Sequence, residues 1–218
     1  MKTLLRSFGL MLLLVAAPLC AEDEQKPIDA YACAPNSART LIDAVDDGNL
    51  DEVSCLLDNG ADVNVQDDNG MTALINAIEA YTLSRVFGDA DDECSIYQKI
   101  VSVLCAHKGL DINAIFFVDN TDGDEHKEST VLQIAADYGD LMIVRRLLQV
   151  PHIKKNVQNY EGQSALHFAA INGYLDVVTE LLVHGVRADL VDNHKKTAQD
   201  YAIENGHDAV ASVLALNK

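Results

Sequence analysis

The stretch from Val157 to Asp189 constrains the fold of this chain more than any other. It begins with a turn at residues 159–162 and continues as two short segments on either side of Gly173. In both segments the apolar residues recur at helical spacing, which predicts two helices joined by a turn. A helix shorter than about 12 residues is marginal in water by itself. The pair therefore needs neighbours of the same kind to bury its apolar faces.

The chain contains such neighbours, because the same pattern occurs five times. Each copy has a small residue in its first segment; these anchor alanines are Ala44, Ala77, Ala135, Ala169 and Ala202. A glycine follows four positions after each anchor, except in the second copy, where Tyr81 takes its place. Thr130 and Ser164 are 34 residues apart, and Ser164 and Thr197 are 33 apart. A period of this length is typical of solenoids built from helix pairs.

The repeats resemble the ankyrin repeat family. The segments SALHFAAINGYLDVVTELLVHGVRAD and LIDAVDDGNLDEVSCLLDNGADVN carry the resemblance, and TALINA, TVLQIAADYGDLMIVRRLL and TAQDYAIENGHDAV are weaker copies. The resemblance covers roughly residues 36–216. It implies an all-α ankyrin solenoid of about five helix-turn-helix repeats.

The first 21 residues are predicted to be a secretory signal peptide. Lys2 and Arg6 precede a short apolar run, and a polar, acidic stretch follows Ala21, after which we expect cleavage. A lipoprotein site at Cys20 is the alternative, although Leu19 is large where such a site takes a small residue. The apolar run is too short to span a bilayer. We therefore expect a periplasmic or secreted protein with no membrane span after cleavage.

The rest of the chain divides into an irregular lead-in over residues 22–36 and an ankyrin domain over residues 37–218. The expected repeats cover about 37–66, 67–114, 115–156, 157–189 and 190–218. Two loop insertions interrupt this pattern, one at residues 81–95 and one at residues 115–129. Insertions in repeat proteins often lie on the binding face, but a surface loop without function explains them equally well.

The net charge of the chain limits the class of partner that it can bind. The chain has 16 basic and 34 acidic residues, which gives a net charge of -18. Nucleic acid is excluded as a partner because phosphate contacts require clustered lysine and arginine. We expect a protein partner instead, with basic character, and a chain that is monomeric when alone. Solubility is the simpler explanation of the acidity.

Four cysteines remain after signal cleavage: Cys33, Cys55, Cys94 and Cys105. An even number in an exported chain makes disulfides plausible. If residues 95–105 form one helix, Cys94 and Cys105 are about 16 Å apart, too far for a disulfide. The other pairings, and free thiols at Cys55 and Cys105, stay open.

Motifs for catalysis or cofactor binding are missing from the sequence. The chain has no HExxH, no GxSxG and no glycine-rich phosphate loop, so we expect no enzyme and no cofactor. The resemblance implies that His167, in SALH, hydrogen-bonds a neighbouring turn. The acidic loop at residues 119–125 does not fit a calcium-binding EF-hand, because Val118 stands where the first ligand should be. Weak calcium binding there remains an alternative.

The candidate binding surface follows from the resemblance. Ankyrin arrays usually grip a partner with their hairpin tips and with the ends of their first helices. The matching tip residues are Asp68, Asn69, Met71, Tyr160, Glu161 and His194, and the matching helix residues are Asp46, Asp47, Glu79, Asp137, Tyr138, Ile171 and Asn172. These positions predict an acidic strip that contains tyrosines, which are common interface anchors.

Three functional hypotheses result. The first is an exported protein that binds a partner through the acidic strip, as an immunity, inhibitor or stress-protection protein. The second is a secreted effector that acts on host proteins. The third is a calcium-dependent structural module.

Overall fold

The computed structural model describes residues 40–68, 70–87, 93–118 and 127–217. Within these ranges the chain forms α1 (Leu41–Asp46), α2 (Leu50–Asp58), α3 (Ala73–Phe87), α4 (Glu93–Ala106), β1 (Ile115–Val118), β2 (Lys127–Thr130), α5 (Val131–Asp137), α6 (Leu141–Leu148), α7 (Ala165–Asn172), α8 (Leu175–Val183), α9 (Ala198–Glu204) and α10 (Asp208–Ala215). The predicted signal peptide, its cleavage site, the lead-in and the acidic loop at 119–125 lie outside the described residues.

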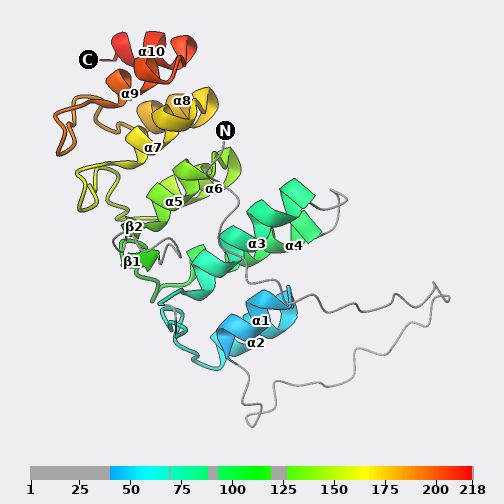
Figure 1. Cartoon of the computed structure of the whole chain (residues 1–218). Coiled ribbons are helices and arrows are strands. Elements are labelled where there is room, and N and C mark those ends of the chain that lie inside the picture. Colours follow the sequence, from blue (N-terminus) through cyan, green and yellow to red (C-terminus); the bar gives the residue numbers. More distant parts are fainter. Residues whose placement is uncertain (1–39, 69, 88–92, 119–126, 218) are drawn as a thin grey trace.

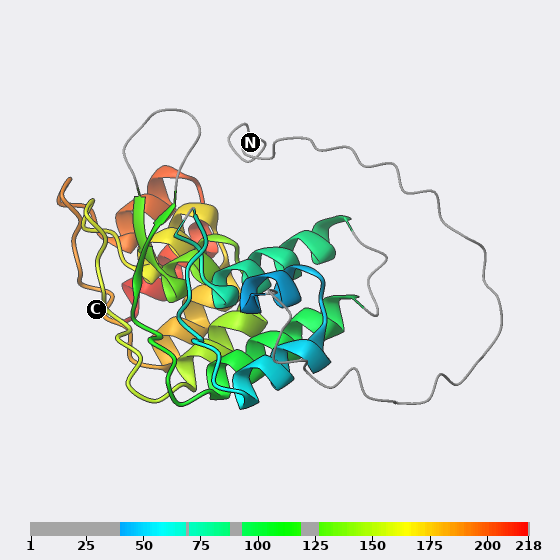
Figure 2. The ribbon, with the colours of Figure 1, turned by 90° about the horizontal axis from the view of Figure 1, so that it is seen from below.

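The helices stack as five antiparallel pairs along one axis (Figure 1). The first helices of the pairs, α1, α3, α5, α7 and α9, lie on one side, and the second helices, α2, α4, α6, α8 and α10, lie behind them (Figure 2). The connections between pairs project together from one end of the helices. We call these connections the fingers and number each by the repeat into which it leads, so that the second finger precedes α3 and the fifth precedes α9. The arrangement confirms the predicted all-helical solenoid.

The first helices start where a short polar side chain caps the backbone. Thr130 accepts a hydrogen bond from the backbone of Gln133, and the Gln133 side chain in turn accepts one from the backbone N–H of Thr130. The same reciprocal arrangement joins Ser164 to His167 and Thr197 to Asp200. Such a box satisfies backbone donors that a helix N-terminus leaves open, so each repeat sets its own starting point.

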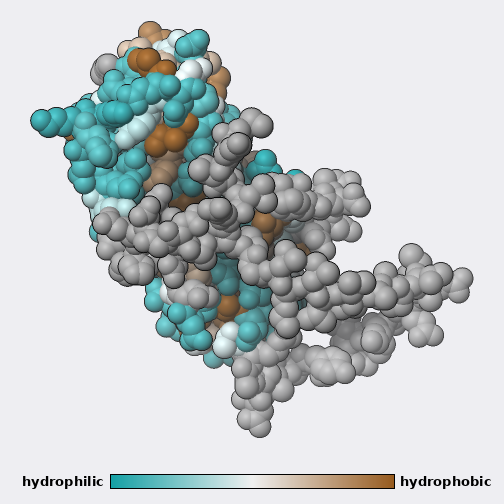
Figure 3. Space-filling model, in the orientation of Figure 1, coloured by the Kyte–Doolittle hydropathy of each residue, from teal (hydrophilic) through white to brown (hydrophobic). Residues whose placement is uncertain are grey.

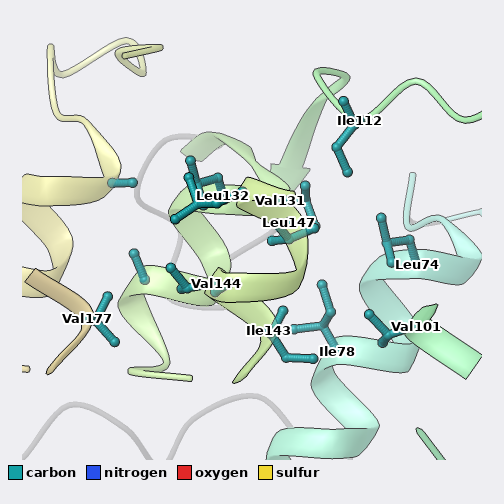
Figure 4. Close-up of a cluster of buried hydrophobic side chains, with 14 of the residues drawn as sticks. Leu74, Ile78, Val101, Ile112, Val131, Leu132, Ile143, Val144, Leu147 and Val177 are labelled. Atoms are coloured by element: carbon teal, nitrogen blue, oxygen red, sulfur yellow. The ribbon is translucent and has the colours of Figure 1, made fainter. Parts of the chain in front are cut away.

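The core runs continuously through all five pairs. Every anchor alanine is fully buried, because a larger side chain would hold the stacked first helices apart. Leucine, isoleucine and valine from both helices of each pair fill the space between layers, as Figure 4 shows around α5 and α6. The leucine pair of α8 is divided, however: Leu181 is fully buried, whereas Leu182 only packs against the edge of the core.

The first insertion differs from the loop that we expected at residues 81–95. Helix α3 continues to Phe87 and α4 already begins at Glu93, so most of the added residues lengthen this pair of helices. The physical reason is Tyr81. In the other repeats a glycine with positive φ ends the first helix, as Gly173 does at φ 76°, and a side chain at such a position is strained. Tyr81 is instead buried in the core and the helix runs on.

The second insertion is also more regular than the loop that we expected at residues 115–129. β1 and β2 pair antiparallel, and the pair next to α5 is Ile115 with Thr130. The same pairing occurs once in the second finger, between Gln66 and Thr72, and once in the fifth, between Val191 and Thr197. The insertion therefore makes the third finger a β-ribbon, seen as the pair of green arrows in Figure 2.

Candidate interaction surface

The predicted helix residues form one line across successive repeats. We call Asp46, Asp47, Glu79, Asp137, Tyr138, Ile171 and Asn172 the helix-end row. Hydrogen bonds join the row from each repeat to the next: Asn76 Nδ2 donates to Asp46 Oδ1 at 3.2 Å, Tyr138 Oη to Glu79 Oε1 at 3.1 Å, Asn172 Nδ2 to Asp137 Oδ1 at 2.9 Å, and Asn205 Nδ2 to the Ile171 carbonyl at 2.9 Å. The structure thus brings these predicted residues together.

The row changes character along its length. Asp46, Asp47 and Asp137 are exposed, whereas Ile171 and Asn172 are half-buried. On the face shown in Figure 3 the coloured surface is largely hydrophilic, with apolar patches between. The exposed carboxylates make the row a surface of negative potential, which favours cationic groups.

Glu79 and Tyr138 are the most enclosed polar pair of the row. Burial is the main cause that raises the pKa of Glu79, although the hydrogen bond from Tyr138 opposes the shift. Burial also raises the pKa of Tyr138, and the neighbouring charge of Glu79 adds to this shift. Their hydrogen bond links α3 to the residue that caps the end of α5.

Hydrogen bonds between side chains and the backbone hold the tips of the fourth and fifth fingers. Asn159 Oδ1 accepts from the backbone N–H groups of Glu161 and Gln163 at 3.1 and 2.8 Å. The fifth finger then joins the fourth, because the Asn193 side chain donates to the Tyr160 carbonyl at 2.7 Å. Tyr160 and Glu161 are consequently presented at fixed positions.

The remaining predicted tip residues differ in how exposed they are. Asp68 and His194 are exposed, as expected for contact residues. Met71 is half-buried and packs against the cluster around Phe116, so it supports the array instead of projecting from a tip. Asn69 lies outside the described residues.

The third residue of α5 and of α7 forms a hydrogen bond to the next repeat. His167 is buried, and its Nε2 lies 3.2 Å from the carbonyl oxygen of Lys196 in the fifth finger, as the resemblance implied. Burial lowers the pKa of His167, which keeps the imidazole neutral. Gln133 makes the equivalent contact one repeat earlier, where its Nε2 donates to the carbonyl oxygen of Gln163 in the fourth finger at 2.8 Å. The sequence analysis missed Gln133, although its position in TVLQ matches that of the histidine in SALH.

The second repeat carries Ile75 at this position. Ile75 packs with Phe116 of β1 and Ile134 of α5 in a small apolar cluster separate from the main core. Phe116 itself stands where the fifth finger has Asp192, because Ile115 and Val191 are equivalent in the strand pairing. A polar bridge between repeats is therefore replaced by an apolar one at this junction.

An ion pair reinforces the same junction. Arg85, on the part of α3 lengthened by the insertion, lies 3.3 Å from Asp140 Oδ2 at the start of α6. The Asp140 side chain is fully buried, and burial raises its pKa while the Arg85 charge opposes the shift. The lengthened helix thus gives a buried carboxylate its counter-ion.

The cysteines give no disulfide among the described residues. Cys55 and Cys105 are free thiols, and burial raises the pKa of Cys105 to about 11, so this thiol is unreactive at neutral pH. Cys94 and Cys105 both belong to α4, as the argument against their pairing required. Cys33 lies outside the described residues.

Metal-binding clusters and membrane-spanning helices are both absent from the described part of the chain. No group of three or more histidine, cysteine or acidic side chains within it could hold a metal ion. Among the helices of the described ranges, none combines the length and the apolar character needed to cross a membrane.

The comparison with protein families agrees with the geometry. The sequence profile described as ankyrin repeats (3 copies) matches residues 26–149 and 132–218. The chain belongs to the ankyrin repeat family, whose repeats are modules for protein–protein interaction and generally carry no catalysis.

Individual relatives differ widely in size. The chain is 27% identical over 186 residues to the ankyrin repeat protein YahD of Escherichia coli K12, covering 78% of this chain and 92% of YahD. It is 35% identical over 114 residues to a TRPA1 channel homologue of Caenorhabditis elegans, covering 50% of this chain but 9% of the channel. For the rice E3 ubiquitin-protein ligase XB3 the identity is 35% over 94 residues, or 42% of this chain and 20% of the ligase.

Proposed function

We propose that this chain binds a basic protein partner along the helix-end row and the adjoining finger tips. One observation carries the proposal: hydrogen bonds donated by side chains of one repeat to groups of the neighbouring repeat hold the row in register from Asp46 to Ile171. A surface that is preorganised in this way loses little conformational entropy when a partner binds. Exposed carboxylates along it would accelerate encounter with a cationic surface.

The N-terminal sequence supports a location for this binding. A basic start, a short apolar run and a small residue before an acidic stretch are typical of a secretory signal. We therefore propose export to the periplasm or beyond, followed by binding there. An immunity or inhibitor protein that covers a basic effector, or a stress-protection factor, would need such a surface in that compartment.

Charge reversal on the row and on one finger tip tests the binding surface. The triple variant Asp46→Lys, Asp137→Lys, Glu161→Lys should bind a partner captured from the envelope fraction at least tenfold more weakly, measured by titration calorimetry with the purified pair. The matched control reverses three exposed acids on second helices, Asp51, Asp58 and Asp208. Equal losses in both variants would show that net charge alone matters and would overturn the proposed surface.

Cell fractionation tests the location. A C-terminally tagged chain should be recovered from the periplasm, shortened by the first 21 residues, and mass spectrometry of its new N-terminus would show cleavage after Ala21. Replacing Lys2 and Arg6 by glutamate should retain the uncleaved chain in the cytoplasm. Recovery from the culture medium would favour the secreted effector, and an uncleaved chain in the cytoplasm would contradict export.

A further inference from the structure

A cavity of about 220 Å³ lies at the base of the fingers between the second and third repeats. Its apolar wall is formed by Leu74, Leu110, Ala114, Phe116 and Val131, which come from the starts of α3 and α5, from the segment after α4 and from β1. Asp111 is the charged member of its lining. Asn64, Gln66 and Thr72 are its other polar lining residues, so the cavity combines an apolar wall with polar groups.

The cavity lies at the junction with the changed bridging residue. In the next two junctions, Gln133 and His167 reach from the first helix to a carbonyl of the following finger. Ile75 has no polar atom in its side chain and packs on Phe116 instead. The side chain of Ile75 therefore cannot hold the third finger against the second repeat by a hydrogen bond.

The size of the cavity restricts what it can hold. Small-molecule sites usually measure about 300–1,000 Å³, so this space is too small for a typical cofactor. It suits one large apolar side chain. In protein interfaces, a few such side chains seated in pockets supply most of the binding energy.

Charge around the cavity restricts the neighbours of that side chain. Asp111 lines the cavity, and Asp62 and Asp68 of the adjoining turn and finger are exposed. Lys108 belongs to the same turn as Asp111 but does not line the cavity. A cationic segment is therefore favoured over a neutral or acidic one.

The cavity and the helix-end row contact the same apolar cluster. Tyr138 of the helix-end row packs against the same apolar cluster as Phe116, and Phe116 lines the cavity. Ile115, the residue between Ala114 and Phe116, is half exposed. The row and the cavity thus meet at the cluster around Phe116, between the second and third repeats.

We propose that this cavity receives a leucine- or phenylalanine-sized side chain from a lysine- and arginine-rich segment of the protein partner. This inference rests on the proposed function, because it names the chemistry that the same surface recognises. It goes beyond that function by assigning a specificity pocket to one junction of the array.

Capped pentapeptides provide the probe. The full chain is titrated with acetyl-Lys-Lys-Phe-Lys-Lys-amide, and binding is followed by methyl NMR at Leu74, Ala114 and Val131. We expect saturable shifts at these methyl groups, at least tenfold weaker binding when the central Phe is replaced by Ser, and no binding when the lysines are replaced by glutamates. Equal binding of the Phe and Ser peptides would overturn the proposal.

Two matched pairs of variants locate the site. Ala114→Trp fills the cavity and should weaken binding at least tenfold, whereas Leu190→Trp, at the equivalent position of the fifth repeat, should not. Asp111→Lys should weaken binding about threefold to tenfold. Asp208→Lys is its control, because Asp208 is also exposed but lies on α10, away from the cavity lining. Loss of binding in both members of either pair would contradict a site in the cavity.

The same titration separates the two proposals. If Asp46→Lys and Asp137→Lys abolish binding while Ala114→Trp does not, the row binds the peptide and the cavity assignment fails. If no variant of the row or the cavity alters binding, the proposed surface fails as well. The melting temperature of each variant shows whether it remains folded.

Discussion

The junction between the fourth and fifth repeats differs from the junction between the second and third. In the former, buried His167 lies against the Lys196 carbonyl, and Asp192 holds the fifth finger by accepting from the backbone N–H groups of His194 and Lys196. In the latter, Ile75 and Phe116 meet at the equivalent positions and the finger becomes a β-ribbon.

This difference shows that one architecture tolerates two chemistries at the same contact. The polar junction is specified by hydrogen-bond geometry, which restricts the finger to a short turn. The apolar junction requires only buried area and shape, so the finger can lengthen and a cavity can remain beside it. A solenoid can thus acquire a distinct binding site by changing two residues and a loop length.

The largest expected effect comes from breaking the apolar junction. Phe116→Ala should reduce the free energy of unfolding by about 3–5 kcal/mol, because it removes a buried aromatic ring and leaves a larger cavity. Urea unfolding followed by circular dichroism measures the change. Ile115→Ala is the control in the same strand, and its effect should be much smaller because Ile115 is half exposed. A larger loss for Ile115→Ala would contradict the packing described here.

The next effect comes from placing the polar residue in the apolar junction. Ile75→His should cost about 2–4 kcal/mol, since it removes buried aliphatic surface and buries an imidazole without a partner. Adding Phe116→Asp supplies a polar partner. The double variant should therefore be more stable than the sum of the single losses predicts, by about 0.5–3 kcal/mol. Simple additivity in a thermal melt would show that the two positions are independent.

A smaller effect is expected at the polar junction. His167→Ala should cost about 1–3 kcal/mol, because buried groups of Ser164 and Lys196 lose their hydrogen-bond partner. His167→Gln should retain most of the stability, since Gln133 already makes the equivalent bridge one repeat earlier. Chemical denaturation of both variants tests this order. If glutamine and alanine destabilise equally, the bridging role of this position is wrong.

The smallest effect concerns pH and the Glu79–Tyr138 pair. Burial raises the folded-state pKa of Glu79 above its ordinary value of 4.5, so the folded state holds this proton more tightly than the unfolded state does. The stability that Glu79 contributes to the folded state is fully present below pH 4.5 and is lost as the pH rises through the raised pKa. Glu79→Gln should therefore show a shallower fall in melting temperature from pH 4.5 to 7.5 than the natural chain. Identical slopes would contradict the assignment.

Several features could be predicted from the sequence because they depend on local rules. Capping residues such as Thr130 and Ser164, the spacing of the anchor alanines and the helical periodicity act within one repeat of about 33 residues. The role of His167 and the line of the helix-end row then followed from stacking identical units. The solenoid and the contact of His167 with the next finger are confirmed, because neighbouring copies bury one another in the same way. Binding of a partner by the helix-end row stays a prediction.

The insertions were harder to predict. At the first, the replacement of a glycine by Tyr81 was visible in the sequence, but only the structure shows that the helix continues and places Arg85 on Asp140. At the second, the apolar residues from Ile115 onward could either cover the core or meet a partner, and the structure shows Phe116 buried and Ile115 half exposed. A sequence does not say which of two adjacent apolar residues faces inward.

The sequence by itself determined the solenoid, the acidity and the order of the repeats, because these depend on the composition and period of each unit. Only the tertiary structure decided how unequal units meet. The pairing of Ile75 with Phe116, the ion pair of Arg85 with Asp140 and the cavity beside Phe116 each join residues of the second repeat to residues of the third. Such contacts depend on how two irregular surfaces fit together, and no local pattern in either repeat encodes that fit.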